Sequence, residues 1–399
     1  MRLPGADGRL DWLQALRLPE QTLAWSLADW QRVVRLARRM RLLARLACAL
    51  DEAGLLPQLP VPVQRHLRGE QQLSRTRIAA VLWAMERVGT VLAATPWPRV
   101  LLKGAAYIGQ DLPIARGRLP SDLDILVPRE HLAACQAALQ AAGWQPPEMD
   151  AHDQAHYDEY GHEVPPMQHA LHDMELDLHH NILPPRNGVL LPVERLLARA
   201  QPSRFAGWLV FQPVDQVLHS AAHLFNDSAV RDRVRDLVDM DGLLRQFGST
   251  PDFWPALVAR ARELELAEPL GLALPLCAQW LQTPVPAQAL AALQPAGPGR
   301  PARALLLWLF AQALLPDEPD VGPTLAQRLA TKLLFVRFHL RRLPLRRLLP
   351  HVWHKLRKLQ QGPAVPAAGR ELAQPIHPPA DAPAEPPVSP PAAPAAPPR

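Results

Sequence analysis

Cysteine is scarce in this chain of 399 residues. Only Cys48, Cys135 and Cys277 occur, and they lie far apart in the sequence. This spacing matches neither a disulfide framework nor the paired cysteines of a zinc motif. We therefore expect three buried thiols in a reducing compartment.

Long apolar runs are also missing. The longest, residues 304–315, has 12 residues and includes Gln312, whereas a membrane-spanning helix needs about 20. The first 20 residues contain no continuous apolar stretch of the secretory type. The sequence thus predicts a cytoplasmic protein without a transmembrane segment. Its hydrophobic content of 48% is enough for two or three domains with a sizeable core.

Acidic residues are absent from residues 328–358, which contain ten Lys and Arg. The net charge of +5 therefore comes from one segment, and the rest of the chain is net acidic. Residues 325–360 also carry an apolar stripe, which is typical of a contact with an anionic membrane surface or with nucleic acid. The alternative is a solvated basic face that packs on neighbouring helices.

Hydrophobic periodicity divides the chain into four parts. Residues 1–94 form an N-terminal helical region, with helices expected at 11–18, 25–50 and 73–94 and a helix start at Ser26 and Asp29. Residues 95–200 form a core of strands and helices, and residues 201–361 form a second helical region. Residues 362–399 are a Pro- and Ala-rich tail, which we expect to be disordered because it cannot build a core. In the second helical region we expect helices at 215–225, 231–244, 255–280 and 301–315.

Two acidic strands stand out in the core. Residues 100–102 are apolar and stop at Lys103-Gly104, and residues 121–127 alternate carboxylates with aliphatic residues. Alternate side chains of a strand share a face, so Asp122 and Asp124 project together. Two adjacent carboxylates repel each other, and a hard divalent cation such as Mg²⁺ removes that cost. The alternative is a half-buried strand with a solvated acidic face.

The second acidic strand covers residues 174–180. Here Glu175, Asp177 and His179 share one face, while Leu176 and Leu178 point to the other. Between the two strands we expect a helix over residues 130–142, capped by Gly143, and a strand from Trp144. This order of elements predicts a small mixed β-sheet, with helical regions on either side, in an α+β fold.

Lys103-Gly104, Arg118 and Ser121-Asp122-Leu123-Asp124 occur in this order, followed by Leu176-Asp177-Leu178-His179. The arrangement resembles the nucleotidyltransferase superfamily that includes DNA polymerase β, and more closely its uncharacterised bacterial branch. The resemblance covers about residues 90–245. It implies transfer of a nucleoside monophosphate from an NTP to an acceptor hydroxyl, with release of pyrophosphate. The sequence leaves the acceptor open among a small molecule, a sugar, a protein side chain and an RNA end.

The resemblance also implies roles for the acidic residues. Asp122 and Asp124 would hold two Mg²⁺ or Mn²⁺ ions in a two-metal mechanism. Asp177 would bind the ion that activates the acceptor hydroxyl and would take its proton. Glu175 competes with Asp177 for this third position.

The nucleotide phosphates would be bound by residues of the first motif. Gly104 would let the backbone approach them, Lys103 and Arg118 would neutralise their charge, and Ser121 completes the motif. Lys103 has an alternative role as a solvated residue that ends its strand.

Histidines are dense in one segment. Seven of the fifteen lie within residues 152–180, namely His152, His156, His162, His169, His172, His179 and His180. We expect His179 to line the site with Asp177. His219 and His223 would lie on one face of a helix beside the sheet, where His223 would contact the site or would form a buried pair with Asp236.

Two other functions stay open. The superfamily usually has Gly-Ser or Gly-Gly where this chain has Gly104-Ala105, which leaves room for a non-catalytic nucleotide-binding or antitoxin-like regulatory module on the same fold. A zinc-dependent hydrolase built on the histidines of residues 152–180 is the second alternative.

Overall fold

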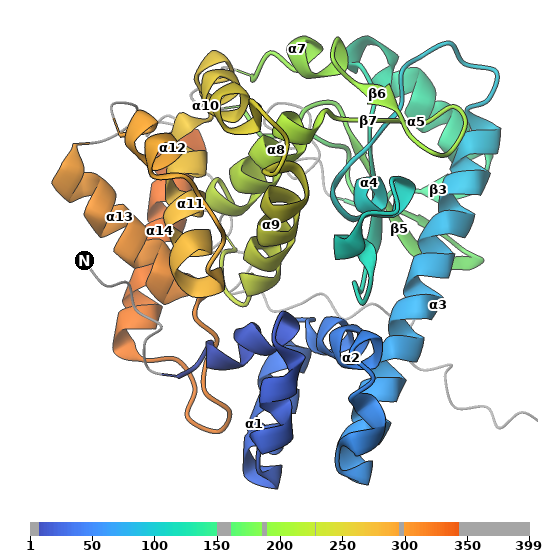
Figure 1. Cartoon of the computed structure of the whole chain (residues 1–399). Coiled ribbons are helices and arrows are strands. Elements are labelled where there is room, and N and C mark those ends of the chain that lie inside the picture. The colour runs from blue at the N-terminus through green and yellow to red at the C-terminus, as the bar shows by residue number, and fades with distance from the viewer. Residues whose placement is uncertain (1–7, 150–160, 186–189, 228, 295–298, 343–399) are drawn as a thin grey trace, which may run out of the picture. The chain divides into compact units, whose positions relative to one another are not determined.

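A mixed β-sheet occupies the middle of the chain (Figure 1). The computed structural model describes residues 8–149, 161–185, 190–227, 229–294 and 299–342. Within these ranges the sheet has seven strands in the order β3-β4-β5-β2-β1-β7-β6. The strands are β1 (Val100–Leu101), β2 (Asp122–Leu126), β3 (Trp144–Gln145), β4 (Met167–His169), β5 (His172–His179), β6 (Gln201–Pro202) and β7 (Leu209–Val210).

Strand β2 lies at the centre of this sheet. It pairs antiparallel with β1 and parallel with β5, and the register with β5 runs from Asp122 opposite Glu175 to Leu126 opposite His179. Leu123, Ile125, Leu176 and Leu178 on these two strands are fully buried. The apolar face of both strands thus points into the core and fixes the carboxylates on the other face.

The N-terminal region is helical, as expected, but its boundaries differ. The elements are η1 (Asp11–Leu16), η2 (Pro19–Ala24), α1 (Leu27–Arg39), α2 (Leu43–Glu52), η3 (Leu56–Gln58) and α3 (Val61–Val91). Ser26 and Asp29 form a capping box, so the predicted helix start is confirmed. The single helix predicted over residues 25–50 is wrong, because the chain breaks at Arg41, whose φ is 56°.

Helix α3 starts well before the predicted residue 73 and packs along the sheet. It contacts β2, β5, α4 (Lys103–Gly109) and α5 (Leu132–Ala141), and Figure 1 shows it beside the strands. The short helices η4 (Pro113–Ala115) and η5 (Arg129–His131) precede β2 and α5. Helix α5 ends before Gly143, whose φ of 100° confirms the predicted left-handed cap.

The second helical region follows the sheet. Its helices are α7 (Glu194–Leu197), α8 (Pro213–Phe225), α9 (Val234–Phe247), α10 (Phe253–Glu263), α11 (Ala267–Leu281), α12 (Ala287–Ala292), α13 (Arg300–Leu314) and α14 (Leu325–Arg342). Helix α8 contacts α9, α10, α11 and, on the sheet side, α4. The one helix predicted over residues 255–280 is wrong: α10 and α11 are separated at Glu265, whose φ is 57°.

The predicted α+β architecture is confirmed: a mixed sheet is flanked by helices on both sides in sequence. The sheet reaches Val210, so β6 and β7 lie beyond the expected core boundary at residue 200. Across the described ranges, no helix combines the length and apolarity that crossing a bilayer requires. The predicted tail at 362–399, much of the basic segment at 325–360, and His152 and His156 fall outside the described residues.

Candidate active site

Asp124 and Asp177 face each other across the centre of the sheet. They are register partners on the parallel strands β2 and β5, so their side chains lie on the same face. One oxygen from each carboxyl and one ring nitrogen of His179 lie within 4.8 Å of one another. Of the two candidates for the third carboxylate, Asp177 is the one in this group, since Glu175 accepts a hydrogen bond from Gln168 at 2.9 Å.

Asp122 lies on the same strand as Asp124, two residues earlier, but outside this group. It begins β2, is half-buried, and pairs in register with Glu175. Among the described residues, the donor group around Asp124 and Asp177 does not include Asp122. Burial and the charge of Asp124 raise the pKa of Asp122, so the two carboxyls of the first motif interact without sharing one donor group. Ser121, just before Asp122, is half-buried as well.

Lys103 turns its side chain toward Asp124. Its φ of 44° directs the chain from β1 into α4, and its ammonium Nζ lies 2.6 Å from Asp124 Oδ1. The Lys103 side chain is only 20% exposed, which contradicts the alternative of a solvated residue at the strand end. Lys103 therefore holds one carboxylate of the group as an ion pair.

The pKa values of Asp124 and Asp177 are shifted in opposite directions. Burial disfavours the charge of Asp124, but Lys103 and the hydrogen bond from His179 outweigh it and hold the pKa of Asp124 well below its usual range. Burial, and then the negative charge of Asp124, raise the pKa of Asp177 to about 7. The Asp177 Oδ1 atom is buried without a hydrogen-bond partner among the described residues. A carboxylate that lacks a partner in this way is suited to bind a cation or a proton.

Arg118 is buried between Gly104 and α9. It forms an ion pair with Asp239 on α9, and its guanidinium lies 5.3 Å from the Tyr107 ring centroid. A Cβ on Gly104 would lie only 2.8 Å from Arg118 Nε. The absence of a side chain at Gly104 thus makes room for Arg118, a role the sequence did not indicate.

Further arginines gather around α9, and the sequence analysis missed them. Arg45 donates to Asp239 at 2.9 Å, and Arg235 pairs with Asp236 at 3.4 Å. Asp236 also pairs with Arg233 at 2.6 Å, so arginines take the place of the predicted His223 pair. The charges of Lys103, Arg118 and Arg235 oppose the rise in the pKa of Asp122, so the field of these arginines reaches the carboxylates. The dense Arg and Asp pattern of residues 231–241 was the available signal.

His179 lies between two carboxylates, as its predicted place at the site requires. Its Nε2 is 3.0 Å from Asp124 Oδ1, and its Nδ1 is 3.0 Å from Glu163 Oε2. Burial disfavours its charge, but Glu163 and the hydrogen bond to Asp124 raise the pKa of His179. Glu163 was not predicted, because it lies in a polar stretch with no periodicity.

His219 and His223 occupy one face of α8, with ring centroids 6.4 Å apart. Burial, with added repulsion from Lys103 and His179, lowers the pKa of His219 to about 3. The pKa of His223 is lowered by burial and by Lys103 as well. Both imidazoles are therefore neutral near pH 7 and lie within the electrostatic reach of Lys103.

The donor group fits a divalent cation. Carboxylate oxygens of Asp124 and Asp177 suit Mg²⁺ and Mn²⁺. The partnerless oxygen of Asp177 is the direct sign of this fit. Lys103 competes with such an ion for Asp124, because its ammonium already neutralises that carboxylate.

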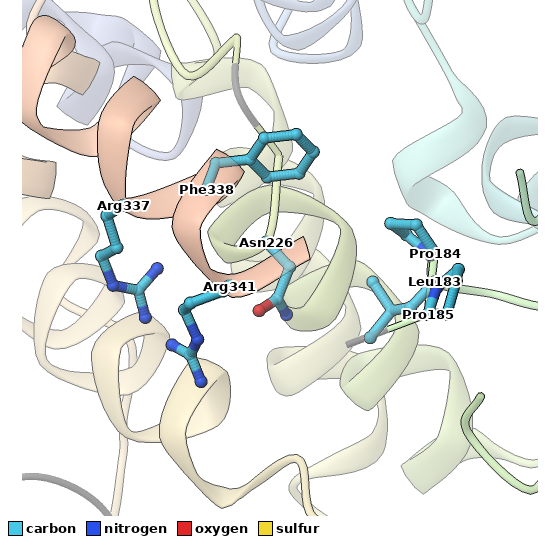
Figure 2. Close-up of a pocket in the computed structure, with 7 residues that line it drawn as sticks. All are labelled: Leu183, Pro184, Pro185, Asn226, Arg337, Phe338 and Arg341. Atoms are coloured by element: carbon cyan, nitrogen blue, oxygen red, sulfur yellow. The ribbon is translucent and has the colours of Figure 1, made fainter. Parts of the chain in front are cut away.

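A small pocket lies away from this site, between α14 and residues 183–185 (Figure 2). It is lined by Leu183, Pro184, Pro185, Asn226, Arg337, Phe338 and Arg341. Its volume of about 20 Å³ holds about one water molecule and no nucleotide. Arg337 and Arg341 both pair with Glu268, so this part of the basic face packs on the helical region.

Comparison with known proteins identifies the family of the chain. Residues 26–282, well over half of the chain, match the family described as uncharacterised nucleotidyltransferase. No curated protein and no solved structure matches the chain. The matched span includes β1, β2 and β5 and extends into the helices on both sides. The resemblance drawn from the motifs is thus confirmed, and the chain belongs to this uncharacterised nucleotidyltransferase family.

Proposed function

We propose that the protein transfers a nucleoside monophosphate from an NTP to an acceptor hydroxyl and depends on divalent cations. The observation that supports this best is the pairing of Asp124 with Asp177 on adjacent parallel strands, with Lys103 beside them. Family membership supports the general class of reaction. The use of two ions, the NTP and the acceptor are parts of the proposal.

In this reaction the acceptor oxygen forms a bond to the α-phosphorus, and the bond from that phosphorus to the pyrophosphate oxygen breaks. Mg²⁺ or Mn²⁺ ions bound by Asp122, Asp124 and Asp177 would supply neutralisation of the phosphate charge. Asp177 is the carboxylate placed to take the acceptor proton, because its Oδ1 atom is buried without a hydrogen-bond partner among the described residues. Asp124, which stays ionised, holds its ligand without exchanging protons.

Positive groups around Asp122 suit a triphosphate. Lys103 comes from the start of α4, Arg118 from the loop before β2, and Arg235 from α9. All three favour the charged form of Asp122, so their positive field extends to the place where the phosphates would bind. Arginine and lysine are the usual partners of phosphate oxygens.

Asp177→Asn and Glu175→Gln form a matched pair for the test, because both residues are carboxylates on β5 two positions apart. Purified protein is incubated with each α-phosphate-labelled NTP, Mn²⁺ or Mg²⁺, and cell extract as the acceptor source. We expect labelled product that falls by about 10²-fold or more in Asp177→Asn, the size expected for loss of a general base. Glu175→Gln should retain most of the activity, and an equal loss in both variants would contradict the assignment of Asp177.

The non-catalytic nucleotide-binding module remains a second candidate, favoured by one observation. The Lys103 ammonium lies 2.6 Å from Asp124, where a cation would bind, and Arg118 fills the space in front of Gly104. A protein of this kind binds an NTP without turnover. Equilibrium dialysis with labelled NTP, followed by product analysis, separates the two: binding with no product under any metal or extract condition favours the module.

We also propose contact of residues 325–360 with an anionic membrane surface. Along α14, Leu329, Leu333, Phe335, Val336 and Leu340 are each between 45% and 51% exposed, and no acidic residue occurs in residues 325–342. Exposed apolar and basic side chains together bind anionic lipid. Co-sedimentation with phosphatidylserine vesicles should be lost when 325–360 is deleted, and equal binding to neutral vesicles would refute the electrostatic part.

A further inference from the structure

Three metal-binding side chains converge next to the carboxylate pair, on its β5 side. Glu163 bridges to His179 as an isolated antiparallel pair, and the backbone N–H of His180 donates to His162 O at 2.9 Å. The backbone thereby fixes His162 and Glu163 against the end of β5. Their donor atoms and a ring nitrogen of His179 all lie within 4.8 Å of one another.

The distances suit one ion. Glu163 Oε2 lies 3.0 Å from His179 Nδ1 and 3.6 Å from His162 Nε2. Tetrahedral ligands about 2.0–2.1 Å from a zinc ion are roughly 3.3 Å from each other. The observed separations lie on both sides of this value, so a small shift of the side chains admits the ion.

His179 is oriented as a metal ligand. Its side chain is 2% exposed, and its Nε2 is 3.0 Å from Asp124 Oδ1. Its Nδ1 atom is buried and lacks a hydrogen bond among the described residues, although Glu163 Oε2 lies 3.0 Å away. A ligating histidine commonly donates its second N–H to a carboxylate, which leaves the first nitrogen for the metal.

We propose that His162, Glu163 and His179 Nδ1 bind a divalent transition-metal ion of the Zn²⁺ class. Two imidazoles and one carboxylate favour such an ion over Mg²⁺. Three protein ligands leave a fourth position for water or another ligand. The ion would hold the His179 ring so that its Nε2–H keeps donating to Asp124, and this consequence for the site rests on the proposed function. The cation site itself is independent of it.

Cobalt is a suitable probe, because Co²⁺ replaces Zn²⁺ and absorbs visible light. The full chain is stripped with a chelator and titrated with Co²⁺ in excess Mg²⁺, with Zn²⁺ as the competitor. We expect about one Co²⁺ per chain and visible bands of a four- or five-coordinate site. His162→Gln and Glu163→Gln should each weaken binding by about tenfold or more.

Two further variants make the result decisive. His66→Gln, on the exposed face of α3, should leave the Co²⁺ titration unchanged. Asp177→Asn should also leave it unchanged while it weakens Mn²⁺ binding and transfer, so a failed transfer reaction does not imply a failed cation site. The proposal is overturned if neither Co²⁺ nor Zn²⁺ binds, or if bound Co²⁺ is lost in Asp177→Asn but kept in His162→Gln and Glu163→Gln. Circular dichroism of each variant confirms that it is folded before titration.

Discussion

Asp124 and Asp177 are direct neighbours across β2 and β5, yet their pKa values move in opposite directions. Lys103 and His179 keep Asp124 ionised, whereas Asp177 is buried beside that charge without a comparable cation. When the pKa values of two adjacent carboxyls are shifted apart, the one with the lower pKa stays charged and the other can exchange a proton. This division leads to the first prediction.

Binding of Mn²⁺ should strengthen as the pH rises through about 7, because Asp177 must lose its proton before it can bind a cation. Below that pH the gain should approach about tenfold per pH unit for one released proton. Calorimetric titrations at several pH values measure it. Asp177→Asn should bind more weakly and with a shallower slope, while Glu175→Gln keeps the slope; an unchanged slope in Asp177→Asn would contradict the role.

Lys103→Gln should destabilise the protein when no divalent ion is present. The substitution leaves the buried Asp124 carboxylate with His179 as its main partner. We expect the free energy of unfolding to fall by roughly 2 kcal/mol, less than for a fully buried pair because Lys103 is partly exposed. Added Mn²⁺ should stabilise this variant more than the wild type, since the ion takes the place of the ammonium. Urea unfolding with and without Mn²⁺ measures both effects, with Lys332→Gln on α14 as the control. Equal stability of Lys103→Gln and wild type without ions argues against the pair.

Gly104→Ala and Gly69→Ala should have opposite effects on the free energy of unfolding. A methyl group at 104 meets Arg118 Nε at 2.8 Å, and the ion pair with Asp239 limits the retreat of Arg118, so we expect a loss of about 1–3 kcal/mol. Gly69 lies in α3 with open space around it, so alanine should add roughly 0.5–1 kcal/mol. Denaturant unfolding of the two variants measures both changes. A stabilised Gly104→Ala would show that Arg118 moves freely.

Asp239→Asn should be among the most destabilising single substitutions on α9. Asp239 is 2% exposed and pairs with both Arg45 and Arg118. Its removal leaves two buried guanidinium groups without their carboxylate, at a cost of about 3–5 kcal/mol. Asp320→Asn removes an exposed partner of Arg35 and should change stability little, because solvent screens that pair. Thermal unfolding compares them, and similar melting temperatures would rule out a structural role for Asp239.

Short-range patterns in the sequence were enough for several elements. Alternation with period two located β2 and the acidic end of β5, and Ser26 with Asp29 marked the start of α1. The breaks at Arg41 and Glu265 were not predictable, because apolar periodicity continues across both and the left-handed backbone depends on tertiary packing. The first part of α3 was missed because its buried face carries few apolar residues: Glu70, Gln71 and Ser74 follow Val63 and Leu67 there.

The candidate site was only partly predictable, because several of its residues meet only in the tertiary structure. Alternation placed Asp122 with Asp124 on one face, but the register that sets Asp124 beside Asp177 exists only in the assembled sheet. Glu163 meets His179 through a single β-bridge, and Arg45 meets Asp239 through contacts between α2 and α9. Pairings of this kind join segments far apart in the chain and produce no local pattern in the sequence.

The parallel pairing of β2 with β5 also bears on when the site forms during synthesis. Asp124 and His179 are separated by 55 positions, and parallel strands need a long connection before they can meet. A nascent chain that ends before β5 carries the first two carboxylates without the strand that completes the group. Because such non-local pairing forms slowly, Asp124 and Asp177 come together only after β5 has been synthesised.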